Sequence, residues 1–234
     1  REHRERVEAY RGILGTLIHL TVWTRPDLAF IIGAMARDCS NPTELHLTVT
    51  RGILRYLRGS VDCSLSYGVT DRTDQLMAFC DANYAGDRTG AKSTSAYVIL
   101  LNGAAVTYSS KLQTVVAQST TEAEVIALAE CTRAVIALRG KLEAMGLRQP
   151  PETVINVDSQ TAIHLAHRPS NGPRSKHYAV RLKFLREHVD RRTVRIVYIP
   201  TQHNISDLLT KLLSKVKTSI FRDIMSGNEP VVYT

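Results

Sequence analysis

Four acidic residues lie in surroundings where a charged side chain is costly. Asp81 and Asp158 each end an apolar run, Glu124 begins the apolar face of a predicted helix, and Asp207 opens a short predicted helix. A buried carboxylate without a partner is expensive, and several in one fold usually share cations. We therefore expect a fold that brings these distant positions to one cation site.

The composition is that of a folded, basic protein. Of the 234 residues, 44% are hydrophobic and 22% are charged, which excludes a disordered chain and suits one medium domain, alone or with a smaller companion. The net charge of +8 favours a polyanionic partner such as nucleic acid.

The cysteines and apolar runs exclude several classes of protein. The four cysteines form no C-x-x-C pair, which argues against a zinc site or disulfide framework and fits a reducing compartment. No apolar run approaches the roughly 20 residues that span a bilayer, and no signal peptide is visible, so no membrane partner is expected. The chain begins with Arg1 rather than Met, so we expect it to be a piece of a longer protein.

The first quarter of the chain is predicted to be helical. One helix covers Tyr10 to Leu20, and a second begins at Pro26, because proline suits the first helical position. Asn41-Pro42 repeats this start signal for a third helix that stops near Gly59. Residues 1–65 are thus a small helical module without chemistry of its own, and 66–75 are the predicted linker.

From residue 76 the pattern changes to strands and longer helices. Asn102-Gly103 between two apolar runs predicts a hairpin, because both residues tolerate positive φ. The order βββ-α-β-α-α-β-α predicts an α/β fold with a mixed sheet flanked by helices, over 76–225 with a tail at 226–234. The predicted elements are strands at 76–81, 93–101, 104–109, 154–158 and 194–199, and helices at 120–145, 159–166, 176–189 and from 204.

The helix that begins near Thr120 distinguishes between two glutamates. Glu124 starts an apolar stripe at 3–4 residue spacing, whereas Glu122 lies roughly 200° around the helix, at about 100° per residue. The segment Ser119 to Glu122 also fits a capping box, which gives Glu122 a local role. We therefore expect Glu124, not Glu122, to face the core and need a partner.

Each of the other three acids also has a purely structural explanation. Asp81 and Asp158 fall at strand ends, where sites of open α/β sheets lie but where aspartate also makes turns. Asp207 at a helix start would also complement the helix dipole. Four carboxylates on separate elements, without His or Cys at ligand spacing, favour hard ions such as Mg²⁺ or Mn²⁺.

Short segments along nearly the whole chain form a recognisable series. They are Tyr10–Leu17, Thr24–Asp27, Ile53–Gly59, Asp81–Asp87, Lys92–Ser95, Ser109–Lys111, Ser119–Glu124, Asp158–Gln160, Lys176-His177, Pro200-Thr201 and Ser206–Lys211. In this order the chain resembles the end of the reverse transcriptase region and the following ribonuclease H domain of Ty1/copia-type retrotransposon polyproteins.

The resemblance implies a ribonuclease H fold that hydrolyses the RNA strand of RNA/DNA hybrids with two Mg²⁺ ions, for which Mn²⁺ can substitute. The family's acidic tetrad falls on Asp81, Glu124, Asp158 and Asp207. Asp81 would bridge both ions, with Glu124 and Asp158 on one and Asp207 on the other. His203, before Asp207, would shuttle protons or assist product release, and a solvated loop histidine is an equal explanation.

Further residues are candidates for contacts with the hybrid. Side chains beside the proposed site could reach sugar hydroxyls or phosphates, although Ser159 serves equally as an N-cap and Thr121 as a first-turn residue. Basic residues could form a phosphate-facing strip. The substrate-contact candidates are Thr120, Thr121, Ser159, Gln160, Lys111, Lys176 and His177.

Departures from the family pattern leave a second class of function open. None of them removes a proposed metal ligand, but together they allow a decayed or domesticated nucleic-acid-binding module that keeps the fold. The departures are Tyr84 for tryptophan, Ala96 for glycine, Val125 for tyrosine, Ala179 for aspartate and Leu212 for proline.

An integrase-type nuclease of the same fold is a third reading, disfavoured by the initial hairpin and the fourth acid at Asp207. Polymerase activity is not expected, since no paired-aspartate motif such as Tyr-x-Asp-Asp is present. The resemblance implies upstream reverse transcriptase domains as partners and an intracellular location, in cytoplasmic retrotransposon particles and in the nucleus.

Overall fold

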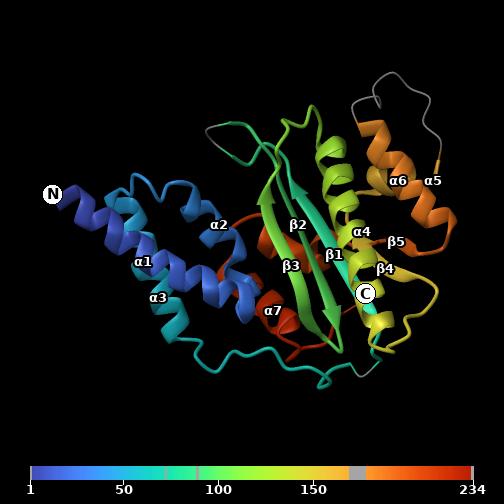
Figure 1. The fold of residues 1–234 in the computed structure, drawn as a ribbon, viewed down its shortest axis with the longest axis horizontal. Coiled ribbons are helices and arrows are strands. Elements are labelled where there is room, and N and C mark those ends of the chain that lie inside the picture. Colours follow the sequence, from blue (N-terminus) through green and yellow to red (C-terminus); the bar gives the residue numbers. More distant parts are fainter. Residues whose placement is uncertain (1, 72, 88–89, 169–177, 233–234) are drawn as a thin grey trace.

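The computed structural model describes residues 2–71, 73–87, 90–168 and 178–232. Two predicted substrate-contact residues, Lys176 and His177, lie outside these ranges. A helical group lies beside a five-stranded sheet in the view of Figure 1, and further helices pack on the sheet itself. No helix within the described ranges combines the length and the apolar character that a membrane span requires.

The helical group contains α1 (Glu2–Trp23), the 3-10 turn η1 (Pro26–Leu28), α2 (Ala29–Arg37) and α3 (Glu44–Arg58). Pro26 begins a helical turn as predicted, but the α-helical hydrogen bonding starts only at Ala29. The predicted start of the third helix at Asn41-Pro42 is wrong by two residues. Thr43 is the N-cap, because its backbone N–H donates to His46 Nδ1 at 3.0 Å and closes a local capping pair.

The sheet contains β1 (Leu76–Asn83), β2 (Thr94–Leu101), β3 (Ala104–Leu112), β4 (Thr153–Val157) and β5 (Val194–Tyr198), in the order β3-β2-β1-β4-β5. The first three strands pair antiparallel, and β4 and β5 extend β1 in parallel. Asn102 and Gly103 have φ values of +52° and +84°, as the hairpin prediction requires. The predicted α/β fold with a mixed sheet in ribonuclease H order is confirmed.

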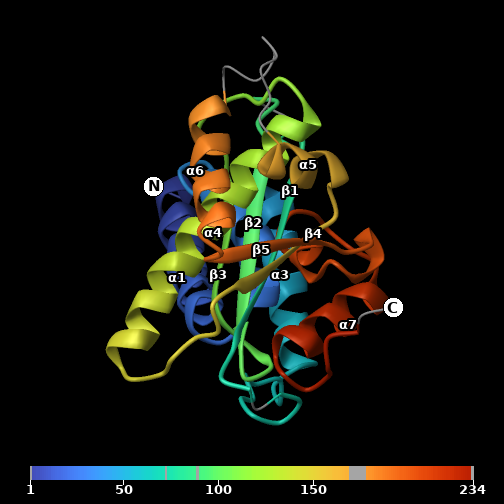
Figure 2. The same ribbon diagram turned by 90° about the vertical axis from the view of Figure 1, so that its right-hand side faces the viewer.

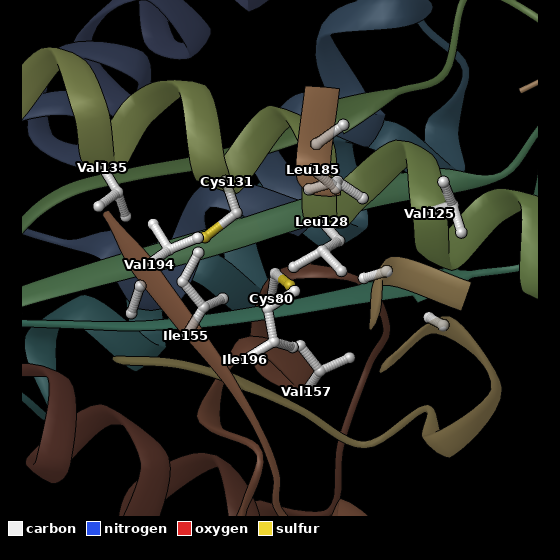
Figure 3. Packing of buried hydrophobic residues seen from close by; sticks show 14 of the residues in the cluster. Cys80, Val125, Leu128, Cys131, Val135, Ile155, Val157, Leu185, Val194 and Ile196 are labelled. Atoms are coloured by element: carbon white, nitrogen blue, oxygen red, sulfur yellow. The ribbon is translucent and has the colours of Figure 1, made fainter. Parts of the chain in front are cut away.

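Alternate residues of β1 enter two different cores. Cys80 lies with Leu128 and Cys131 in the layer beneath α4 (Thr120–Ala144), which Figure 3 shows. Phe79 points to the opposite face, into the core with Leu209. The first face is covered by α4, α5 (Gln160–His167) and α6 (Ala179–Asp190), and the second by α7 (Lys215–Met225). Figure 2 shows α4 and α7 on opposite sides of the sheet. Both faces of β1 are therefore buried.

The apolar stripe of α4 is buried at Leu128, Cys131, Val135 and Leu142 and partly buried at Leu138, but Met145, at the predicted end of the helix, is 72% exposed. The helix ends at Ala144, and Gly146 turns the chain away with φ +83°. Met145 is the C-cap, so the predicted helix end at 145 is one residue too far along the chain.

The C-terminal segment also differs from the prediction of one helix starting at Asn204. Two 3-10 turns, η3 (Thr201–His203) and η4 (Ile205–Leu209), precede α7. Asn204 caps only η4, whose 3-10 bond from the Thr210 N–H to the Asp207 carbonyl does not continue into an α-helix. The true N-cap of the last helix is Ser214, whose hydroxyl oxygen accepts from the Lys217 N–H at 3.3 Å.

The helical group packs directly against the sheet, in addition to being joined to it by the chain. Helix α2 lies along β3, the edge strand, and the Tyr108 hydroxyl of β3 donates to the Thr21 carbonyl. The segment 66–75 contains no helix or strand in its described part, but the Ser66 N–H donates to the Ser226 carbonyl at 2.7 Å. Covering β3 removes an exposed edge that could pair with another chain.

Candidate metal centre

The pairing of β1 with β4 brings Asp81 and Asp158 together. The last parallel pair is Cys80 with Val157, so each aspartate is the next residue along its strand. Asp81 does not end β1, as the sequence suggested, because it still pairs with Ala96 of β2. Its backbone is thus held on one side, while its carboxylate lies where β1 and β4 separate.

Glu124 reaches the same place from the first turns of α4. Ligand oxygens of Asp81, Glu124 and Asp158 all lie within 4.8 Å of one another. Within the described residues, Glu124 Oε2 is buried and receives no hydrogen bond. The structure therefore brings together three of the four predicted metal ligands, and one of them has an unpaired oxygen that a cation would satisfy.

Glu122 is also buried, at 6% exposure, which the helical-phase argument did not anticipate. The segment before α4 folds over the helix start, where the Gln113 side chain donates to the Ala123 carbonyl. Glu122 is satisfied locally, since its carboxylate accepts from the Gln118 N–H at 2.8 Å and its own N–H donates to Ser119 Oγ. Both glutamates are buried, and Glu122 has the local role at the helix start that was predicted, although its carboxylate accepts from Gln118 and not from the N-cap Ser119 as a complete capping box requires.

Burial disfavours the charged forms of two of the clustered carboxylates, Asp81 and Glu124. Burial raises the pKa of Glu124 to about 9, helped by repulsion from Asp81 and Asp158, while a hydrogen bond from the Ala82 backbone opposes the shift. Burial also raises the pKa of Asp81 to about 6, against the hydrogen bond from Thr210. Near pH 7 Glu124 holds a proton, and a divalent cation is the natural replacement for it.

Asp207 lies apart from this group of three and already has cationic partners. Its carboxylate is 1% exposed, with Lys211 Nζ 2.8 Å from Oδ1 and Lys217 Nζ 3.0 Å from Oδ2. Oδ1 receives no well-aligned hydrogen bond, so its contact with Lys211 is an ion pair. Asp207 is the third residue of η4 rather than a helix start, and its role as a fourth ligand stays a prediction.

Two neighbours of the cluster were not singled out from the sequence. The Thr210 hydroxyl donates to Asp81 Oδ2, and Lys211 Nζ lies 4.0 Å from the same oxygen. The sequence does indicate an ion pair for Lys211, because a lysine four residues after Asp207 can reach it on a helical turn. Thr210 carried no such signal, since its contact depends on the docking of η4 against β1.

The remaining candidates occupy the surroundings of the cluster. Ser159 is the N-cap of α5, with its hydroxyl oxygen accepting from the Ala162 N–H at 3.3 Å, so its structural role is present. His203 lies in η3, with Nε2 3.0 Å from the Gln202 side-chain nitrogen. Thr120, Gln160 and Lys111 are exposed, and Thr121 is partly buried. As substrate or catalytic groups, all of these stay predictions.

The fold and the site together define a ribonuclease H-like protein. The sheet is mixed, with five strands in the order β3-β2-β1-β4-β5, and the carboxylates cluster where β1 and β4 separate.

No protein-family model matches the chain. Individual relatives do: the retrovirus-related Pol polyprotein from transposon TNT 1-94 of Nicotiana tabacum is 38% identical over 92% of the chain. The corresponding protein from transposon RE1 of Arabidopsis thaliana is 34% identical over 88% of it.

The transposon Ty1-JR1 Gag-Pol polyprotein of Saccharomyces cerevisiae is 25% identical over 91% of the chain. These relatives, which match most of the chain, are Pol polyproteins of copia/Ty1-type retrotransposons. The chain spans only 16%, 14% and 12% of the lengths of these three relatives.

Solved ribonuclease H structures are similar at a lower level. LC11-RNase H1, isolated from compost, is 19% identical with a TM-score of 0.43, over 59% of this chain and 94% of that one. RNase H1 from the archaeon Halobacterium salinarum is 18% identical with a TM-score of 0.43, over 58% of this chain and 94% of that one.

Proposed function

We propose that this chain hydrolyses the RNA strand of RNA/DNA hybrids with two divalent cations, as part of a retrotransposon reverse transcriptase. The observation that carries the proposal is the convergence of Asp81, Glu124 and Asp158 from β1, α4 and β4, with ligand oxygens within 4.8 Å of one another. Mg²⁺ is the proposed ion, because the donors are all carboxylate oxygens, and Mn²⁺ is expected to substitute.

The ligands in this proposal are Asp81, Glu124 and Asp158, with Asp207 as the fourth. When bound, the ions would supply an activated water and neutralise charge at the scissile phosphate. Glu124 would release its proton as it becomes a ligand, since its pKa of about 9 keeps it neutral beforehand. Thr210 would hold Asp81 in position through the hydrogen bond to Oδ2.

The hybrid would be bound by basic and polar groups around the cluster. Lys111 and Arg37 line one groove between α2 and β3, where two cationic side chains could contact phosphates. Four polar candidates lie at the starts of α4, which carries Glu124, and of α5, which follows Asp158. They would reach the sugar-phosphate backbone, and they are Thr120, Thr121, Ser159 and Gln160. His203 would move protons or assist product release.

The test is cleavage of a hybrid whose RNA strand is labelled, by the purified chain with Mg²⁺. We expect cuts in the RNA strand, none in duplex DNA, and loss of cleavage in Asp81→Asn and Glu124→Gln. Glu122→Gln is the matched control, because it changes a neighbouring buried glutamate that lies outside the acidic cluster. Binding without cleavage would instead support the non-catalytic alternative, and cleavage that survives Asp81→Asn would refute the proposed site.

The proposed setting is a longer polyprotein in which the upstream reverse transcriptase domains deliver the hybrid. The similarity to retrotransposon Pol polyproteins, of which the chain spans only a small part, supports this setting. We place the activity in cytoplasmic retrotransposon particles and in the nucleus. Fractionation of cells that express the full polyprotein, followed by detection of this segment, tests that location.

A further inference from the structure

Two lysines neutralise Asp207, and they are held in different ways. Lys217 is anchored by its surroundings, since Nζ donates to Asp207 Oδ2 and approaches the Thr201 carbonyl at 3.4 Å, and it lies 4.9 Å from the centre of the Phe221 ring. Lys211 Nζ has two carboxylate neighbours, Asp207 at 2.8 Å and Asp81 at 4.0 Å. Lys217 thus neutralises one acid, whereas Lys211 lies between two acids.

The position between Asp81 and Asp207 is the one that a second divalent ion would need. Asp81 belongs to the cluster with Glu124 and Asp158, and its Oδ2 atom also faces Lys211. A cation bridging Asp81 and Asp207 would meet the ammonium group of Lys211 at the same oxygens. Two cations at this separation repel strongly in a partly buried site, so they cannot share it.

The Lys211 side chain also has room to leave. Its exposure is 38%, and it lines a pocket of about 390 Å³ between the helical group and the segment after η4. The other walls of this pocket include Ile53, Leu208 and Leu213. A lysine can lay its aliphatic stem along such an apolar wall and keep its ammonium group in water.

We propose that Lys211 is a built-in cation that occupies the Asp81–Asp207 position until a divalent ion displaces it. Lys211 therefore preserves the carboxylate arrangement in the ion-free protein and weakens binding of the second ion relative to the first. The second ion displaces the Lys211 side chain, whereas the first ion binds at Asp81, Glu124 and Asp158. This inference rests on the proposed use of two ions, but it concerns ion binding alone and not RNA cleavage.

The test is a titration of the full chain with Mn²⁺ in the absence of nucleic acid, with free Mn²⁺ followed by electron paramagnetic resonance. We expect one tighter and one weaker ion in the natural protein. Lys211→Met, which keeps the length of the side chain without its charge, should tighten the second ion by about tenfold or more. An unchanged or weaker second ion in Lys211→Met, or the absence of a second ion in both proteins, overturns the proposal.

Two further variants separate displacement from a general charge effect. Lys217→Met removes a charge from the same carboxylate but leaves Lys211 between the acids, so its effect on the second ion should be clearly smaller. Lys211→Arg keeps the charge and should keep the second ion weak. Equal tightening in Lys217→Met, or tightening in Lys211→Arg, refutes displacement by Lys211.

Thermal unfolding without metal gives an independent readout. Lys211→Met should unfold at lower temperature than the natural protein and recover more stability from added Mn²⁺, because its acids have lost their internal cation. An equal gain from Mn²⁺ in both proteins contradicts the proposal. Failure of RNA cleavage with both ions bound would sink the proposed function and leave this inference standing.

Discussion

Asp81 and Asp158 occupy equivalent positions on neighbouring parallel strands, each one residue beyond the last pair, Cys80 with Val157. Their proximity is therefore a consequence of register, since a slip of one residue would turn one side chain to the opposite face of the sheet. Glu124 completes the cluster from the helix above this pair of strands.

The free energy of unfolding of the metal-free protein should fall as pH rises. The pKa of Glu124 is about 9 in the folded protein and near 4.5 when unfolded, so the folded state binds more protons between these values. The loss should reach about 1.4 kcal/mol per pH unit in that window. Urea unfolding at several pH values with a chelator present measures it.

Glu124→Gln should flatten this pH dependence, because the amide cannot ionise. Glu122→Gln should retain the dependence, since Glu124 is untouched there. Equal slopes in the natural protein and in Glu124→Gln would contradict the assignment of the proton to Glu124.

Binding of the first Mn²⁺ ion near pH 7.5 should release about one proton, because Glu124 must ionise to become a ligand. Calorimetric titration in two buffers with different ionisation enthalpies measures the number of protons released. Glu124→Gln should bind Mn²⁺ more weakly and release fewer protons. Proton release that persists in this variant would show that another group supplies the proton.

Removal of Arg25 should destabilise the docked helical group. Asp27 accepts from Arg25 Nε at 3.0 Å and Nη2 at 2.8 Å, and from the Tyr56 hydroxyl at 2.7 Å, with both charged side chains at most 5% exposed. Arg25→Met leaves Asp27 buried without its counter-charge, at a cost of about 3–5 kcal/mol in urea unfolding.

Two controls test this account. The double variant Arg25→Met with Asp27→Asn should recover part of the loss, because the unpaired charge is gone. Arg191→Met, which breaks an exposed pair with Glu187, should cost less than about 1 kcal/mol. A similar cost for Arg25→Met and Arg191→Met would mean that the buried pair contributes no more to the free energy of unfolding than the exposed pair does.

Gly227→Ala should be more damaging than Gly146→Ala, although both glycines follow a helix with φ near +80°. A Cβ at Gly227 would lie 2.2 Å from the Ser66 carbonyl oxygen, whereas a Cβ at Gly146 meets nothing within 4 Å. We expect about 1–2 kcal/mol for Gly146→Ala from backbone strain, and about 2–5 kcal/mol for Gly227→Ala with the added clash. Equal losses of thermal stability would contradict the close approach of Ser66 to Gly227.

Much of the fold follows from local patterns. Asn102-Gly103 marks the hairpin because few residue pairs accept positive φ, and Gly146 marks the end of α4 for the same reason. The turn of the helix placed Glu124 on the side that meets Asp81 and Asp158. These features depend on steric rules within a few residues, so they are readable along the chain.

Other features depend on contacts between distant segments. Glu122 is buried because the segment before α4 folds over it. The placement of Lys211 between Asp81 and Asp207 requires η4 to dock against β1. Charge interactions act over several ångströms in any direction, so spacing along the sequence does not reveal them.

For the acidic residues, the sequence and the tertiary structure each determine a different property. Residue type and periodicity were sufficient to single out Asp81, Glu124, Asp158 and Asp207 as candidate cation ligands. Which cation each carboxylate meets in the metal-free protein is a property of the packed molecule: a proton on Glu124, and lysine ammonium groups on Asp207. Burial and distance set those choices, and both exist only after the chain has folded.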